Sequence, residues 1–470
     1  MSLCSILFLF IIIKIAIDKT NVKIKYLNYV TLLMIIEVLN INAAFLAIND
    51  SFINIKYVMS IFLIIYTLYY IKKSIILIPK LLLYLECLLL LSVIVGIFIE
   101  IINPYNGLII NYNTSKGWDL YVLGLLNKEK VDISYGSILI LYTKVFLYTI
   151  TTCLIKTTCN KKDIIYILNN IIKYTRFIIY YGFVEFIIKN VINNLDIIIW
   201  FNTVMFGKSS QISFADDVYR LTGVTSEPSY FVISLFTIII YNIIIKKIID
   251  NDKSMKSLIV YHKKDIFFMI GIMLLTGGFS MVWYLLMVVF LYLILNMKRN
   301  FKFLMKLLLF ILIIISGIIY FVNNYADGYI GGRLNTALMI LGEMVFYGGI
   351  DMNNGLFVAS SNLARFVSIY DTVIDFVNRP LLGLGLGIET AHSGLAMLLV
   401  DFGIIGIYLL FRVVLYRVDK SIKYDKLFIF CFFIIVNIPV GIKNIGFEVF
   451  NILFIELTSF YLCKGSEKKR

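Results

Sequence analysis

The sequence predicts an all-α membrane protein with about thirteen transmembrane helices (about 11 to 14), and three observations lead to this fold class. The chain has 470 residues, of which 60% are apolar and only 15% charged, and its mean hydropathy is +0.91. Apolar runs long enough to cross a bilayer recur along the chain, and clusters of basic residues separate them. A water-soluble globule needs more polar groups than this to cover its surface, so lipid is the expected solvent.

The expected helices follow from these apolar runs, taken in order along the chain. The stretch 265–297 has basic clusters on both sides, so it must enter and leave the membrane on the same face. The residues from Thr276 to Ser280 include two adjacent glycines and supply the turn that divides this stretch into two short helices. The predicted spans are 3–17, 28–48, 57–71, 81–102, 134–155, 176–192, 229–245, 265–278, 281–297, 303–322, 392–411, 427–442 and 446–463.

The basic residues indicate the topology. The net charge is +14, but about 31 of the 43 Lys and Arg residues lie in short clusters between spans, as in cytoplasmic loops. They form no continuous patch, so nucleic acid is not an expected partner. The six cysteines lie in or beside apolar runs without CxxC or Cys/His spacing, so neither a disulfide framework nor a metal site is expected. The clusters are 14–25, 72–80, 156–176, 246–264, 298–306, 412–426 and 464–470.

The first apolar run precedes its lysines and has no small-residue cleavage site. This order predicts a retained first helix with its N-terminus outside the cell. The whole chain, 1–470, is then a single integral membrane domain in which three polar loops lie on the extracytoplasmic side. They are 103–133, 193–228 and 323–391, and the length of the last favours a functional role.

Within the largest loop, 360–377 is predicted to form an amphipathic helix at the membrane surface. Its apolar residues recur at helical spacing, and Pro380 ends the helix. Arg365 lies opposite the apolar stripe with Ser368 and Thr372 beside it, which leaves two interpretations, a merely solvated charge or a group that faces a polar ligand. The stripe consists of Leu363, Phe366, Val367, Tyr370, Val373, Ile374 and Val377.

A second candidate cation, Arg220, comes just before a predicted membrane helix. Ser226 could cap this helix and Pro228 could lie in its first turn. Arg220 is either a functional cation or a residue placed there by accident of position.

Three alternating glycines, Gly383, Gly385 and Gly387, superficially resemble a dinucleotide-binding fingerprint. No strand is predicted before them, which argues against nucleotide binding, and they instead make a turn or let the backbone approach a ligand. His392 opens a predicted helix at the lipid boundary, where an imidazole could act as a base near neutral pH. A structural role for this histidine is the alternative.

Three short motifs follow one another in the C-terminal third of the chain. They are Arg-Pro-Leu-Leu-Gly-Leu-Gly at 379–385, His-Ser-Gly-Leu at 392–395 and Asp-Phe-Gly-Ile-Ile-Gly at 401–406, which contains Gly403 and Gly406. In this order they resemble the signature of the O-antigen polymerase and ligase superfamily, the Wzy-type polymerases and their lipid A ligase relatives. The segments 220–228 and 277–283 are also similar to family positions, although Ser280 is followed by methionine where the family has arginine.

The resemblance implies a metal-independent membrane glycosyltransferase of the GT-C type in the inner membrane, with no cofactor. Its donor and acceptor would be undecaprenyl diphosphate-linked oligosaccharides, joined at the outer face into O-antigen, capsule or exopolysaccharide. Membrane lipid, a chain-length regulator and a flippase would be its partners. Arg220 and Arg365 would bind the diphosphate with help from Arg379, and His392 or Glu227 would take the proton from the acceptor hydroxyl.

Three other functions remain open at this point. A ligase that transfers finished glycan to lipid A or protein shares the motifs. A transporter or flippase of lipid-linked sugars is disfavoured, because no internal repeat is visible and the candidate charges lie in exterior loops. A structural or sensory membrane protein could also use a long exterior loop.

Overall fold

The computed structural model is mostly helical in the part of the chain that it describes, so the predicted predominance of helix is confirmed. Two small antiparallel β-pairs are the other regular elements of this part. The predicted number of transmembrane helices stays a prediction. The described residues are 2–39, 41, 44–48, 51–74, 135–207, 214–215, 218–225, 228–251, 256–276, 372–385 and 393–414, with single positions between 80 and 94 and between 284 and 320.

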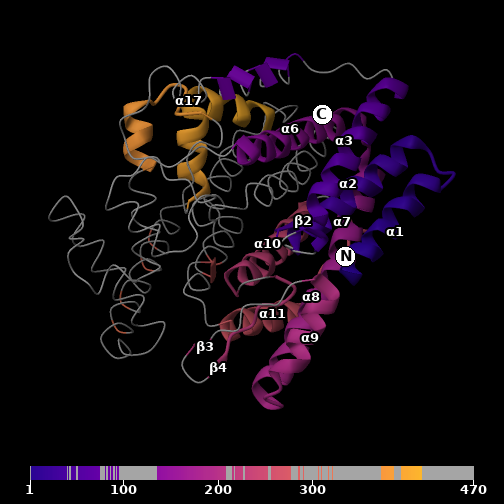
Figure 1. Ribbon diagram of the computed structural model, residues 1–470, viewed down its shortest axis with the longest axis vertical. Helices are drawn as coiled ribbons and strands as arrows, with labels where there is room; N and C mark the ends of the chain where they lie inside the picture. Colours follow the sequence, from indigo (N-terminus) through magenta and orange to yellow (C-terminus); the bar gives the residue numbers. More distant parts are fainter. Residues whose placement is uncertain are drawn as a thin grey trace.

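The N-terminal part contains three helices and a β-hairpin (Figure 1). Helices α1 (Leu3–Ile17) and α3 (Ile55–Ser74) cover the expected spans 3–17 and 57–71. The expected span 28–48 is wrong in its second half, because α2 (Val22–Val38) ends early and β1 (Ala44–Ile48) pairs with β2 (Ser51–Asn54). The asparagines at 40, 42 and 49 interrupt this apolar run and favour a turn over a continuous helix.

Two helices come next, α6 (Tyr135–Thr158) and α7 (Lys161–Thr175), and α7 packs against α2. Asn160 and Asp163 form a reciprocal capping box that starts α7, and Asp163 also forms an ion pair of 2.5 Å with Lys23 of α2. The helix lies within a segment expected only as a basic cytoplasmic cluster. Its buried face consists of Ile164, Ile167, Leu168, Ile171 and Ile172.

The middle of the chain forms a helical hairpin followed by two longer helices. α8 (Phe177–Phe186) continues as the π-helical turn η1 (Ile187–Val191), and α9 (Leu195–Phe206) folds back against η1. α9 is a correction, because 193–228 was expected as a polar loop although 195–206 is largely apolar.

The second β-pair and the two longer helices complete this part. β3 (Phe214–Ala215) pairs with β4 (Val218–Tyr219), and α10 (Pro228–Asn251) and α11 (Lys263–Leu275) contact one another. α11 ends where the sequence predicts a break, since Thr276 is its C-cap residue.

The C-terminal described part consists of helical residues 372–378, a connecting segment and α17 (Gly394–Val414). The helix at 372–378 ends just before Pro380, as predicted, but Thr372, which was predicted to face water or a polar ligand, lies inside the protein. Thr372 and Asp375 are buried and make polar contacts, whereas Val373, Ile374 and Val377 of the apolar stripe are exposed. Only the polar side of this helix thus differs from the prediction, because the apolar stripe was expected to lie against the membrane surface.

Large apolar side chains are exposed on several described helices. α3 is the one helix of the described part that is long and apolar enough, by length and composition, to cross a membrane, and 28% of its most apolar window is buried. Shorter apolar helices occur at 3–17, 195–206, 231–243 and 395–409. The exposed side chains include Leu7, Phe10, Ile61, Ile65, Trp200 and Phe267.

Candidate functional site

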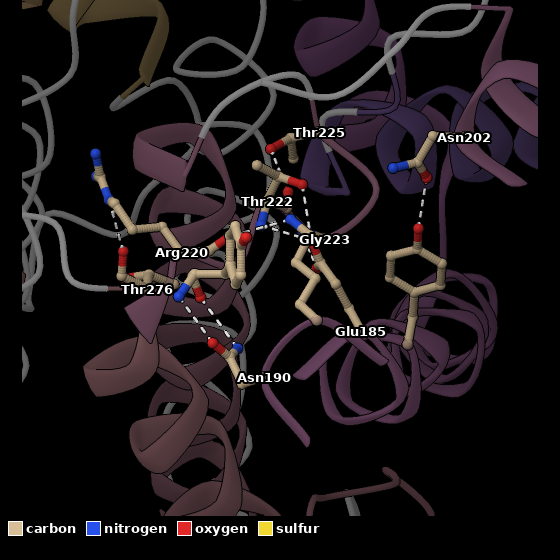
Figure 2. A network of polar contacts seen from close by, with 11 residues as sticks. Glu185, Asn190, Asn202, Arg220, Thr222, Gly223, Thr225 and Thr276 are labelled. Carbon is tan, nitrogen blue, oxygen red and sulfur yellow. Dashed lines mark hydrogen bonds and ion pairs between the residues drawn. The ribbon is translucent and has the colours of Figure 1, made fainter. Parts of the chain in front are cut away.

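Arg220 follows β4 and lies in a segment, 219–225, that the neighbouring η1 and α8 hold by its backbone (Figure 2). The amide side chain of Asn190 contacts both backbone polar groups of Tyr219, the residue before Arg220. Its Oδ1 accepts from the Tyr219 backbone N–H at 2.7 Å, and its Nδ2 donates to the Tyr219 carbonyl at 3.1 Å. Both backbone polar groups of Tyr219, the residue before Arg220, are therefore held by one side chain.

The C-terminal side of Arg220 is held by a buried ion pair. Lys189 Nζ lies 2.6 Å from Glu185 Oε1, and the two side chains are only 1% and 0% exposed. Lys189 also donates to the Arg220 carbonyl at 3.1 Å. Glu185 accepts from the Thr222 backbone N–H at 3.0 Å, from the Thr222 hydroxyl at 2.9 Å and from the Gly223 N–H at 2.7 Å. We call the three side chains of Glu185, Lys189 and Asn190 the Arg220 clamp.

The Arg220 side chain is directed to the end of α11. Its Nε donates to the Thr276 carbonyl at 2.9 Å, and Figure 2 shows the rest of the guanidinium directed away from that oxygen. The C-terminal end of a helix carries partial negative charge, which favours a cation there. Arg220 is half-buried. Arg220 is thus held by hydrogen bonds both along its backbone and at the Nε of its guanidinium.

The π-helical turn explains how neighbouring residues of one helix reach the same segment. The Ile192 N–H donates to the Ile187 carbonyl at 2.9 Å, five residues earlier, which widens this turn. The chain then reverses at Asn193, whose φ is +55°, and Asn194 caps α9 by accepting from the Ile197 N–H at 3.3 Å. π-Helical turns inside helices are frequent at functional sites.

The two glycine-containing motifs of the C-terminal part meet at a break in α17. Gly403 has φ +61° and ψ −172°, which interrupts the helix, and a Cβ there would lie 2.3 Å from the Leu381 carbonyl oxygen. A Cβ on Gly383, whose φ is +70°, would lie 2.1 Å from the Val400 carbonyl oxygen. These glycines therefore allow close packing of two backbone segments rather than the approach of a ligand.

Backbone hydrogen bonds join the same two segments. Leu384 N–H donates to the Val400 carbonyl at 2.7 Å, and Ile404 N–H donates to the Pro380 carbonyl at 2.9 Å. Gly385, at the end of the 380–385 segment, and Gly406, in α17, are both buried. Backbone groups of α17 near the break thus find hydrogen-bond partners in the 380–385 segment.

Four of the predicted site residues, Arg365, Glu227, His392 and Gly387, lie outside the described residues. Arg379 is half-buried, and its backbone N–H caps the helix at 372–378 by bonding to the Asp375 and Phe376 carbonyls at 3.1 Å. Figure 1 shows β4, which precedes Arg220, and α17 at separate places along the long axis. The described residues therefore do not bring Arg220 and Arg379 together.

The clamp residues were not among the predicted site residues. The signal that could have found them is a glutamate and a lysine four residues apart inside an apolar run expected to span the membrane. Asn190 gave no comparable signal, because an asparagine at the end of an expected span is ordinary. Within the described ranges, no three His, Cys, Asp or Glu side chains gather in a way that could hold a metal ion.

Comparisons with protein-family models, with curated proteins and with solved structures found no match to this chain.

Proposed function

We propose that this protein is a membrane glycosyltransferase that joins undecaprenyl diphosphate-linked oligosaccharide units into a polysaccharide, with Arg220 contacting the diphosphate of the donor. The observation that carries the proposal is the fixed presentation of Arg220 by the clamp. The motif resemblance at 379–406 supports the reaction class. Transfer of finished glycan by a ligase of the same superfamily is the alternative.

A membrane location is supported by the distribution of apolar side chains. The apolar composition of the whole chain, the candidate span α3 and the exposed faces of α1, α3 and α9 all fit lipid as the solvent. The proposed orientation places 193–228 and 323–391 at the outer face of the inner membrane, where the alternating basic clusters predict them. Arg220 would then meet a carrier lipid at that face.

The reaction gives an arginine a direct role. The oxygen of the acceptor hydroxyl forms a bond to the anomeric carbon of the donor sugar, and the bond from that carbon to the diphosphate breaks with its electron pair. Negative charge on the leaving diphosphate increases in the transition state, and a guanidinium can stabilise it through two parallel hydrogen bonds. The hydroxyl proton passes to a base, for which His392 and Glu227 are the candidates. Arg365 is proposed as the second diphosphate cation.

The test is chain growth with purified protein in detergent or vesicles and an undecaprenyl diphosphate-linked repeat unit as both donor and acceptor. Arg220→Ala should lower product formation by about 100-fold or more, since a preorganised charged donor to a transition state contributes about two orders of magnitude. Arg220→Lys should also lose most activity, because an ammonium is a point charge and cannot form the planar fork. Product length is read by gel or mass spectrometry.

Arg412→Ala is the matched control, because Arg412 is an exposed arginine near the end of α17 that donates to the Tyr408 hydroxyl. Its product ladder should equal that of the wild type. A wild-type protein that leaves the repeat unit unextended but transfers preformed polymer to lipid A would replace the polymerase by the ligase. Full chain growth by Arg220→Ala would remove Arg220 from the proposal.

A further inference from the structure

We infer that Glu185, Lys189 and Asn190 are positioning residues that act on the reaction through Arg220, an inference that rests on the proposed function. None of the three was singled out by motif or resemblance. Each contacts backbone groups that flank Arg220 rather than its guanidinium. Their common effect is to fix the point from which the Arg220 side chain extends.

The hydrogen bonds cover consecutive peptide groups on both sides of Arg220. Asn190 holds the N–H and carbonyl of Tyr219, Lys189 holds the carbonyl of Arg220, and Glu185 holds the N–H groups of Thr222 and Gly223. The backbone from the end of β4 to Gly223 is thereby held by side chains of α8 and η1. A diphosphate-binding arginine needs such support, because a displacement of the cation weakens both parallel hydrogen bonds at once.

Further contacts tighten the turn that follows Arg220. The Thr225 hydroxyl and backbone N–H both donate to the Thr222 carbonyl, at 2.7 and 3.1 Å. The Thr222 hydroxyl meanwhile donates to the same Glu185 oxygen that contacts Lys189. The Glu185 carboxylate is therefore the centre of a network that includes both the lysine and the turn.

The burial of the ion pair argues for a role beyond stability. Glu185 and Lys189 are almost fully removed from solvent, and removing two charges from water costs free energy that their attraction does not reliably restore. A well-packed apolar pair would serve stability as well. Buried ionisable residues in apolar spans are typically kept for function. Here the two charged side chains make four hydrogen bonds to a single segment, the one that carries Arg220.

The first measurement is hydrogen exchange of wild type and Glu185→Gln, which is nearly isosteric but replaces one acceptor oxygen by an amide donor. Peptides that cover 219–225 should exchange about tenfold faster or more in the variant, because bonds to a charged acceptor are among the stronger ones. Peptides from α2 should be unchanged. This measurement needs no substrate, so it reports on the clamp whether or not the protein transfers sugars.

The second measurement is chain growth by Glu185→Gln, Arg220→Ala and the double variant. Glu185→Gln alone should lower turnover by about tenfold or more, and it should have little further effect when Arg220 is already alanine. A merely structural role for Glu185 would instead multiply the two losses. Lys23→Met and Lys189→Met form the matched pair of lysine variants, since Lys23 pairs with Asp163 on other helices, and only Lys189→Met should lose activity.

Unchanged exchange at 219–225 in Glu185→Gln would overturn the inference, and so would multiplicative losses in the double variant. A wild-type protein without chain growth would overturn the proposed function instead. In that case the exchange measurement decides alone whether the clamp holds the segment.

Discussion

The Tyr181 hydroxyl donates a 2.5 Å hydrogen bond to the Asn202 side chain and so joins α8 to α9 (Figure 2). Both residues are buried. Tyr181→Phe should destabilise the protein by about 1 to 2 kcal/mol, because the Asn202 oxygen would be left without this donor in the interior. Thermal unfolding in detergent, followed by a fluorescent thiol probe or light scattering, measures the change.

Tyr180→Phe is the control for this substitution, because Tyr180 is the neighbouring tyrosine of α8 and is 68% exposed. It should leave the unfolding temperature within experimental error. Equal effects of the two substitutions would mean that the contact to Asn202 contributes nothing to the folded state.

Cys159 allows a prediction about thiol chemistry. Burial raises the pKa of its thiol to about 12. The thiolate is the reactive form, so at pH 8 Cys159 should react with a maleimide far more slowly than a thiol of ordinary pKa, and the rate should rise as the pH approaches 12. Mass spectrometry of tryptic peptides gives the rate, with the denatured protein as reference. Rapid labelling of the folded protein at pH 8 would contradict the burial of this residue.

Among single residues, the sequence predicted Arg220 as a candidate site residue but not the clamp residues around it. Arg220 is visible because an isolated arginine precedes an apolar run. The clamp depends on contacts between residues 29 to 38 positions apart, such as Asn190 with Tyr219 and Glu185 with Gly223. Local spacing carries no information on such pairs, whereas the unusual charge pair inside an apolar run does.

At the scale of an element, the break in α17 leads to a prediction about the stability of the fold. Gly403→Ala should cost at least about 2 kcal/mol or prevent folding, because alanine is strained at this positive φ and its Cβ would overlap the Leu381 carbonyl. The yield of folded protein by size-exclusion chromatography and the unfolding temperature are the measurements. A second glycine in a helix provides the control.

The control is Gly271→Ala in α11, where a Cβ would meet nothing within 4 Å. It should be neutral or raise stability by up to about 1 kcal/mol, since alanine is the better helix former. If Gly403→Ala were equally harmless, the α17 break and its packing against the 380–385 segment would be incorrect.

Helices were predicted best where capping residues and apolar periodicity agree. Ser2 and Asn21 accept backbone hydrogen bonds at the starts of α1 and α2, and α1 coincides with its predicted span. Prediction failed where one apolar run contains two kinds of element, as in 28–48, or where an apolar helix is too short to span, as α9 is. Hydropathy measures the total apolar content of a window and does not detect a change of direction within it.

The side on which the long loops lie is a property of the whole molecule. Asn324→Cys in a cysteine-free background should react with an impermeant maleimide in intact cells, because 323–391 is predicted to face outward. Lys256→Cys, an exposed position in a basic cluster, should react only after lysis. The reverse pattern would place Arg220 and a carrier-bound glycan on opposite sides of the bilayer.

Alternating charge clusters predict this sidedness from the sequence, but the packing of the helices against one another has no such signal. The contacts of α2 with both α3 and α7, for example, depend on packing of apolar faces that are interchangeable in composition. The separation of β4, which precedes Arg220, from α17 in Figure 1 likewise has no signal in the sequence.

The π-helical turn η1 makes the middle of the chain sensitive to its exact length. Such a turn corresponds to an ordinary helix that has gained a single residue. Deleting Ile188 would replace the widened turn by a regular one of about 3.6 residues, and the helix beyond it would keep its direction. Lys189 and Asn190 lie in η1 and would change their positions relative to Glu185, so the deletion should disturb the Arg220 clamp more than the contact of Tyr181 with Asn202.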